Sequence, residues 1–353
     1  MKVQVENKNR IYYIDILRAI SCIAVVMIHA SANYVMKNFG DINFIVGDII
    51  DSLFRFAVPI FLMISGSLLL DENYNYTEIK NKNRIIKMIQ FFIFWSFLYM
   101  LIFTIIIPIK NGHRPNIKIS IGTFGLGYYH LWFVYLIVGL YLLLPLLRLW
   151  IKDKNIRYVR YFIFLAIIFG FLLPQFVEIG SYFSNVFDNL QTILNYIGMD
   201  SVSGYLLYFI LGWYLRFYEI KNKKIIYFLG IISIIFEISM TYFLSLHFNK
   251  AIQTYSNLSL NVLFQSMMVY IYIKDKYSKA KKNNTFINFI SHYSLGIYAI
   301  HACIIDLTYM LLDKSDITSS LIGIPILFLV SFGISLLGSF MMNKTNLLKK
   351  FVS

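Results

Sequence analysis

Three ionisable side chains stand on one face of the first apolar segment of the chain. Arg18 and His29 are eleven residues apart, which is three turns of an α-helix, so both point to the same side about 16 Å apart along the axis. Asp15 is three residues before Arg18, close enough on a helix to pair with it. One helix face therefore offers an anion-binding group and a titratable base. Spacing alone leaves a second interpretation open, in which Asp15 and Arg18 anchor the helix and His29 only packs.

Further basic groups occur in the next two segments. Arg55 begins the stretch RFAVPIFLMISG, in which Pro59 removes a backbone donor and Gly66 permits close helix approach. Arg84 and Lys87 are three residues apart on an emerging helix and are suited to clamping a phosphate. The alternative for this last pair is ordinary positive charge in a cytoplasmic loop.

Two later segments carry a mixture of aromatic and titratable groups. The fourth opens with YYHLWF, and the ninth contains SHYSLGIYAIH. Aromatic residues at a membrane interface usually form a belt at lipid level, but a histidine among them is also a candidate acid, base or acceptor-binding group. Glu237 is an isolated carboxylate in the seventh segment. A role in proton relay is open to it, but the sequence does not indicate a second titratable group that would act with it. The candidates from the fourth and ninth segments are His130, Trp132, Ser294, Tyr298 and His301.

Long apolar runs must position these residues. The 353 residues are 58% hydrophobic and only 14% charged, against about 25% charged in soluble domains. The net charge of +14 falls in short clusters between apolar runs, which is typical of loops beside anionic lipid and not of a nucleic-acid groove. The sequence therefore predicts a membrane protein of one all-helical domain.

About twenty apolar residues are needed for one helix to cross the hydrocarbon core. Ten segments meet or approach this length, of which the sixth and eighth are short. The sequence predicts a polytopic helical bundle with spans at 12–35, 46–70, 86–109, 128–148, 158–177, 203–218, 224–246, 257–273, 287–311 and 319–342.

The loop charges predict the orientation of these spans. Most of the 32 Lys and Arg residues fall in alternate loops, together with both termini, and such loops face the cytoplasm. This orientation places Arg18 and Arg84 towards the cytoplasm and His29 towards the outside. The loops predicted to lie outside contain only Lys37, Lys110, Arg114, Lys118, Lys250 and Lys314.

Four of the stretches, in this order, resemble the acyltransferase-3 family of membrane acyltransferases. They are Asp15 to Arg18 with the ten-residue interval to His29, RFAVPIFLMISG, HLWF and SLGIYAIH. The resemblance covers nearly the whole chain. It implies an O-acetyltransferase in a bacterial cell membrane, which moves an acyl group, usually acetyl, from cytoplasmic acyl-CoA to a hydroxyl of a cell-surface glycan or its lipid-linked precursor.

The resemblance also assigns roles by position. It implies that His29 and Arg18 are the essential catalytic pair, and that Arg18, Arg84 and Lys87 bind acyl-CoA. The family often has two arginines three apart at this place, and a lysine at 87 lacks the bidentate guanidinium. No metal is expected. The residues expected to line the acceptor site or passage are Asp15, Arg55, His130, Trp132, Ser294, Tyr298 and His301.

Two other functions remain open from the sequence. Some members of the family are described as transporters that export polysaccharide or take up serine, and charges lining a pore fit that function equally well. Broken helices in two related halves would favour transport, but the sequence has no such repeat. A non-catalytic scaffold is the third interpretation, and it poorly explains why Arg18 and His29 share a face. The acceptor, the acyl chain, the oligomeric state and the choice between direct transfer and an acyl-enzyme intermediate stay undetermined.

Overall fold

The fold was analysed in a computed structural model, which describes residues 11–352 with gaps at 36–38, 281–283 and 315–318. The described residues form helices and no strands, which confirms the predicted all-helical class. Two π-helical segments interrupt the order, at Leu101–Ile106 and Ile168–Leu172. The α-helices are α1 (Tyr12–Val35), α2 (Ile42–Phe54), α3 (Ala57–Leu69), α4 (Glu78–Met100), α5 (Ile107–Lys110), α6 (Ile117–Leu126), α7 (Trp132–Trp150), α8 (Ile156–Ile167), α9 (Leu173–Ser181), α10 (Val186–Ile197), α11 (Met199–Phe217), α12 (Lys223–Phe248), α13 (Leu260–Tyr277), α14 (Thr285–Lys314) and α15 (Ser320–Asn343).

Eight helical stretches among the described residues are long and apolar enough to cross a membrane. They match eight of the ten predicted segments and confirm a polytopic bundle. The short sixth and eighth segments form α11 and α13, which are not among the eight. The backbone of α11 leaves the helical conformation at Gly204, and α13 ends in the charged run of Lys274, Asp275 and Lys276.

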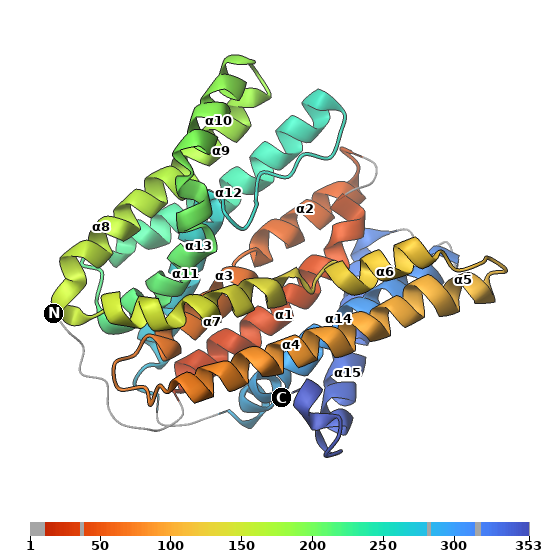
Figure 1. Cartoon of the computed structure of the whole chain (residues 1–353). Coiled ribbons are helices and arrows are strands. Elements are labelled where there is room, and N and C mark those ends of the chain that lie inside the picture. Colours follow the sequence, from red (N-terminus) through yellow and green to blue (C-terminus); the bar gives the residue numbers. More distant parts are fainter. Residues whose placement is uncertain (1–10, 36–38, 281–283, 315–318, 353) are drawn as a thin grey trace.

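The helices alternate in direction, so their connections gather at two ends of the bundle (Figure 1). At one end, the Tyr12 hydroxyl at the start of α1 accepts a hydrogen bond from the backbone of Asn284, just before α14. Lys223 at the start of α12 pairs with Asp275 near the end of α13. This end, called the basic end below, carries the connections that the charge pattern predicts to be cytoplasmic. The other is called the opposite end.

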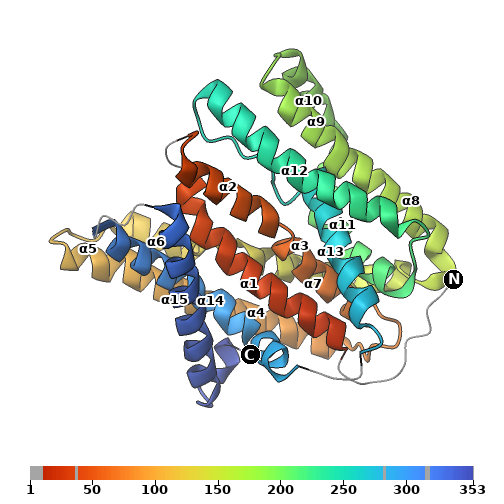
Figure 2. The same cartoon turned by 180° about the vertical axis from the view of Figure 1, so that it is seen from behind.

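Helix α1 occupies the centre of the bundle, and both views place it between α12 and α4 (Figures 1 and 2). It packs against α2, α3, α13, α14 and α15. Leu17 and Ala24 are fully buried there. The face that carries Arg18 and His29 is turned towards α14, where the two side chains meet Ser291 and His301, and both are half-buried.

The second predicted span is broken into α2 and α3, with Arg55 and Phe56 between them. Pro59 explains the position of the break, because proline lacks the N–H that would bond to the carbonyl four residues earlier, and its ring crowds that carbonyl. Gln265 of α13 supplies a replacement, since its side-chain amide donates to the carbonyls of Ser52 and Leu53 at 2.8 and 3.1 Å. The backbone groups freed at the break are thus satisfied inside the bundle.

Helices α3 and α11 approach each other through two glycines. A Cβ at Gly66 would lie 1.7 Å from the carbonyl oxygen of Phe209, and one at Gly212 would lie 1.9 Å from that of Met63. The close approach predicted for Gly66 is confirmed. This contact fixes α3, and with it the break at Arg55, against the core.

Candidate active site

Three histidines that are far apart in the sequence meet in the half of the bundle nearer the opposite end. His29 comes from α1, His301 from α14, and His130 from the turn before α7. The His29 and His301 ring centroids are 5.2 Å apart, as are those of His130 and His301. The structure therefore brings three of the predicted site residues into one cluster, called the histidine cluster below.

The hydrogen bonds of His301 fix its tautomer. Its Nδ1 lies 3.1 Å from the carbonyl oxygen of Ile297 and 2.8 Å from that of Tyr298. A carbonyl only accepts, so Nδ1 carries the proton and Nε2 of the neutral ring has a free lone pair. This Nε2 is buried and has no hydrogen-bond partner among the described residues. It is a ready acceptor beside His29.

The side chains of the three histidines differ in their exposure. His130 and His301 are buried, whereas His29 is half-buried. Tyr129, whose ring centroid is 5.2 Å from that of His29, is 47% exposed. The turn that carries Tyr129 lies between α6 and α7. His29 is therefore the most exposed of the three histidines, beside an exposed tyrosine.

The turn before α7 is held by two tyrosines. The Tyr298 hydroxyl donates to the carbonyl oxygen of His130 at 2.6 Å. The Tyr128 hydroxyl donates to the Asp306 carboxylate, and its ring stacks on that of Tyr99 at 4.5 Å. Sequence reasoning did not find Asp306. The available signal was a carboxylate in an apolar span, five residues after His301.

Arg18 lies about three turns nearer the basic end, on the same face of α1. Its Nη1 is 3.4 Å from Asp15 Oδ1 and donates to Ser291 Oγ at 3.2 Å. The Ser291 hydroxyl in turn donates to Asp15 Oδ1 at 2.7 Å. The pairing of Asp15 with Arg18 predicted from their spacing is confirmed, and Ser291 of α14 holds both side chains.

The guanidinium groups of Arg84 and Arg18 both interact electrostatically with the hydroxyl of Tyr141. Arg84 also faces the ring of Tyr74, with 5.2 Å from its guanidinium carbon to the ring centroid. Lys87, one turn later on α4, is exposed, whereas Arg84 is half-buried. The two predicted phosphate-clamping residues therefore differ in exposure.

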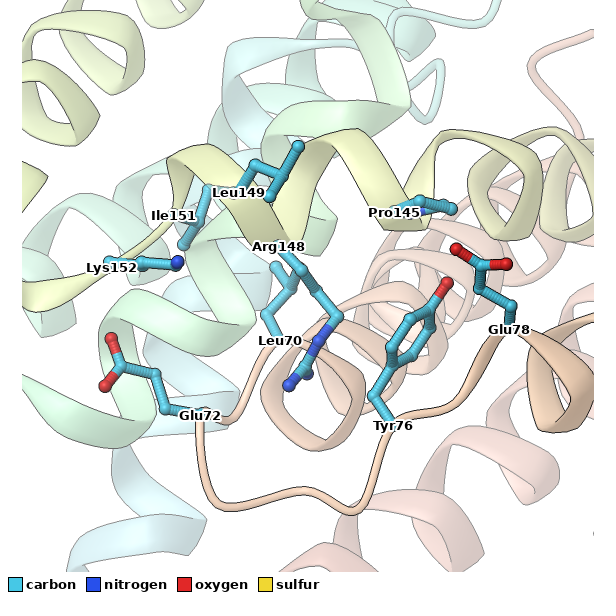
Figure 3. A pocket seen from close by; sticks show the side chains of 9 residues that line it. All are labelled: Leu70, Glu72, Tyr76, Glu78, Pro145, Arg148, Leu149, Ile151 and Lys152. Atoms are coloured by element: carbon cyan, nitrogen blue, oxygen red, sulfur yellow. The ribbon is translucent and has the colours of Figure 1, made fainter.

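A pocket of about 510 Å³ opens at the basic end beside Tyr74 (Figure 3). It lies between the end of α7 and the connection from α3 to α4, and Arg148 projects into its middle. Arg148 donates to the carbonyl oxygens of Leu69 and Asp71. The pocket is lined by Leu70, Glu72, Tyr76, Glu78, Pro145, Arg148, Leu149, Ile151 and Lys152. Sequence reasoning counted Arg148 and Lys152 only as cytoplasmic loop charges.

The remaining predicted residues lie around these centres. Ser294 is buried, donates to the carbonyl oxygen of Ser291 at 2.9 Å, and faces α1 near Cys22. Trp132 packs on Tyr205 of α11, with ring centroids 5.4 Å apart. Arg55 pairs with Asp51 of its own segment and also interacts electrostatically with His29.

A family model described as an acyltransferase domain matches residues 11–343, nearly the whole chain. The chain belongs to the acyltransferase-3 family. No curated protein and no solved structure matches it. Membership identifies the chain as a multi-pass membrane acyltransferase.

The two centres on α1 differ in their chemistry. The histidine cluster offers unprotonated ring nitrogens that can take a proton from a hydroxyl. The Arg18 cluster offers guanidinium donors of the type that bind phosphate. Helix α1 joins the two centres through the core.

Proposed function

We propose that this acyltransferase moves an acetyl group from acyl-CoA, bound at the basic end, to a hydroxyl of a cell-surface glycan or its lipid-linked precursor at the opposite end. The observation that carries the proposal is the placement of Arg18 and His29 on the face of α1 that is turned towards α14. Each has become part of a separate polar centre, the first with Asp15 and Ser291 and the second with His301. We further propose that the basic end faces the cytoplasm of a bacterial cell, where acyl-CoA is made.

The proposed donor site extends from Arg18 to the pocket of Figure 3. Arg18 and Arg84 would hold phosphate oxygens, as guanidinium groups do. A pocket of about 510 Å³ lies within the usual range for small-molecule sites, and Arg148 and Lys152 add positive charge there. The thioester arm would then follow α1 for about 16 Å towards His29. Lys87 would contribute only to the outer edge of such a site, since it is exposed.

In the proposed reaction, one ring nitrogen of His29 takes the proton of the acceptor hydroxyl. The hydroxyl oxygen attacks the thioester carbonyl carbon, the new C–O bond forms and the C–S bond breaks. The thiolate of CoA leaves and receives the proton from His29. His301 supports this step, because its free Nε2 lone pair can accept a hydrogen bond from the other ring nitrogen of His29 and so fix the tautomer.

The proposed acceptor site is lined by aromatic side chains at the opposite end. Tyr129 is exposed beside His29. Tyr298 and Trp132 flank the same turn from α14 and α7. Apolar ring faces edged by hydroxyl and imidazole groups suit a sugar, which has apolar faces and many hydroxyls.

Transport is the second candidate, and the break between α2 and α3 favours it. Discontinuous spans with buried charges are typical of substrate sites in transporters. Here Arg55 and its partner Asp51 lie beside such a break. The sequence has no related half in which this break would have a counterpart, so acetyl transfer is the function that the histidine cluster supports better.

The test uses membranes that contain the full chain and acetyl-CoA with a labelled acetyl group, followed by mass analysis of surface glycans. Replacing His29 with alanine should lower acetyl transfer by about 10²- to 10⁴-fold, the usual contribution of a general base. His247 is exposed on α12, so His247→Ala is the matched control and should transfer normally. Undiminished transfer by a correctly inserted His29→Ala protein would overturn the role of His29. Glycan or amino-acid movement without any acetyl label would favour the transporter.

A further inference from the structure

A second buried polar centre lies between α2 and α12, beside the break in the second span. Asp48 and Asp51 are one turn apart on α2, and Glu237 is buried on α12, which packs against α2. Their exposed fractions are 1%, 0% and 0%. These three residues are called the carboxyl cluster below. The proposed acyl transfer uses none of them.

The hydrogen bonds of the carboxyl cluster are incomplete. Asp51 pairs with Arg55 through one oxygen, and Asp48 accepts a 3.4 Å hydrogen bond from Ser52. Both oxygens of Glu237 and the second oxygen of Asp51 have no hydrogen-bond partner in the part of the chain that the structure describes. Glu237 interacts electrostatically with Arg55, Asp48 and Asp51, so its unpaired carboxyl group belongs to this centre.

The surrounding elements bring too little positive charge to balance three carboxylates. Among the described residues, the cation that pairs with the carboxyl cluster is Arg55, which directly follows α2 and whose guanidinium carbon lies 4.3 Å from the ring centroid of Tyr255. From α13, the neutral side-chain amide of Gln265 donates to the carbonyl oxygen of Ser52. From α1, His29 interacts electrostatically with Arg55. Three ionised carboxyl groups against one guanidinium would leave two negative charges inside the membrane.

Such an excess of charge is unstable in a low-dielectric interior. Ionised groups are retained there only when each is paired and hydrogen-bonded, and an unpaired carboxyl group takes up a proton instead. A metal ion is the other way to neutralise carboxylates, but no group of three or more Asp, Glu, His or Cys side chains in the described residues converges enough to hold one. A proton needs no such convergence, since it neutralises one carboxyl group at a time.

We propose that Asp48, Asp51 and Glu237 form a proton-binding site at the break of the second span, in which Glu237 and Asp48 hold protons at neutral pH while Asp51 stays ionised against Arg55. Three observations support it independently of acyl transfer: the unpaired and fully buried Glu237, the single compensating guanidinium, and the broken span, a feature that lines ion sites in other membrane proteins. Arg55, which pairs with Asp51 of this site, also interacts electrostatically with His29.

The test is infrared spectroscopy of the full chain in lipid nanodiscs at neutral pH, in sodium-free buffer and in sodium buffer. Protonated carboxyl groups give a carbonyl stretching band that is separate from that of carboxylates. Glu237→Gln and Asp48→Asn resemble the protonated side chains and should each remove part of this band. Glu72 lines the surface pocket at the basic end, so Glu72→Gln is the control and should leave the band unchanged.

Two results would overturn the proposal. One is a band that persists unchanged in the folded Glu237→Gln, Asp48→Asn double variant, which would mean that both groups are ionised in the native protein. The other is a band that disappears when sodium is added, which would identify the occupant as a metal cation. Both results are independent of acetyl transfer, so failure of the proton site leaves the proposed function standing, and the reverse holds as well.

Discussion

The contact between α3 and α11 leads to a quantitative prediction for Gly66. Replacing it with alanine adds a methyl group 1.7 Å from the carbonyl oxygen of Phe209. A carbon and a carbonyl oxygen approach to about 3.3 Å without repulsion, so the two helices must part by roughly 1.5 Å. The obstacle is backbone, which cannot turn aside as a flexible side chain can.

The parting disturbs a fully packed interface. Met63 of α3 and Phe209 of α11 have exposed fractions of 0%, and every core contact along both helices loosens when the helices separate. Overpacking of this kind costs about 1–3 kcal/mol, and we expect Gly66→Ala to fall at the upper end of that range. Gly212→Ala should behave in the same way, since its Cβ would lie 1.9 Å from the carbonyl oxygen of Met63.

The measurement is the free energy of unfolding in mixed detergent micelles, followed by circular dichroism. Gly139 and Gly333 are matched controls, because a Cβ at either position meets nothing within 4 Å. Alanine there should leave the stability unchanged or raise it by about 0.5–1 kcal/mol, since glycine is the poorer residue in a helix. If Gly66→Ala is as stable as Gly139→Ala, the helices do not pack as closely as described and the reasoning fails.

Two further predictions concern the ends of the proposed passage. Lys152→Glu, in the pocket at the basic end, should raise KM for acetyl-CoA several-fold at low salt and less at high salt. Lys154 is outside the pocket lining, so Lys154→Glu is the control and should leave KM unchanged. Equal effects of the two substitutions would place the donor site elsewhere. Asp306→Ala should raise KM for the acceptor, because it releases the turn that carries Tyr128. Asp306→Asn can still accept the Tyr128 hydrogen bond, so its KM should stay close to that of the unaltered protein. A KM as high as that of Asp306→Ala would show that the charge of Asp306 matters instead.

Local periodicity was enough to predict eight long apolar helices and the contact between Asp15 and Arg18 within one of them. The pairing of Asp15 with Arg18 follows from a three-residue spacing and is present at 3.4 Å. Gly66 was recognised as a point of close approach, because glycine in an apolar helix has few other uses. Pro59 marked a helix irregularity, and the break occurs four residues before it.

Contacts between distant segments could not be read from spacing. Tyr128 and Asp306 are 178 residues apart, and Arg148 and Leu69 are 79 apart, so no helical period relates them. Glu237 had no visible partner because its neighbours, Asp48 and Asp51, lie on another span. His29, His130 and His301 were grouped by resemblance to the family, and the structure supplied their 5.2 Å ring contacts.

The hydrogen bonds from Gln265 to the break in the second span constrain the order in which the protein can fold during membrane insertion. The carbonyls of Ser52 and Leu53 depend on the amide of Gln265, and Gln265 leaves the ribosome 213 and 212 residues after them. Until then those carbonyls have no partner from α13, and unsatisfied backbone groups cost several kcal/mol in lipid. The second span therefore enters the bilayer before its bend can be capped, and the bend is completed only after α13 has been inserted. A chain arrested before α13 would contain every residue of α2 and α3 but not the geometry that places Arg55.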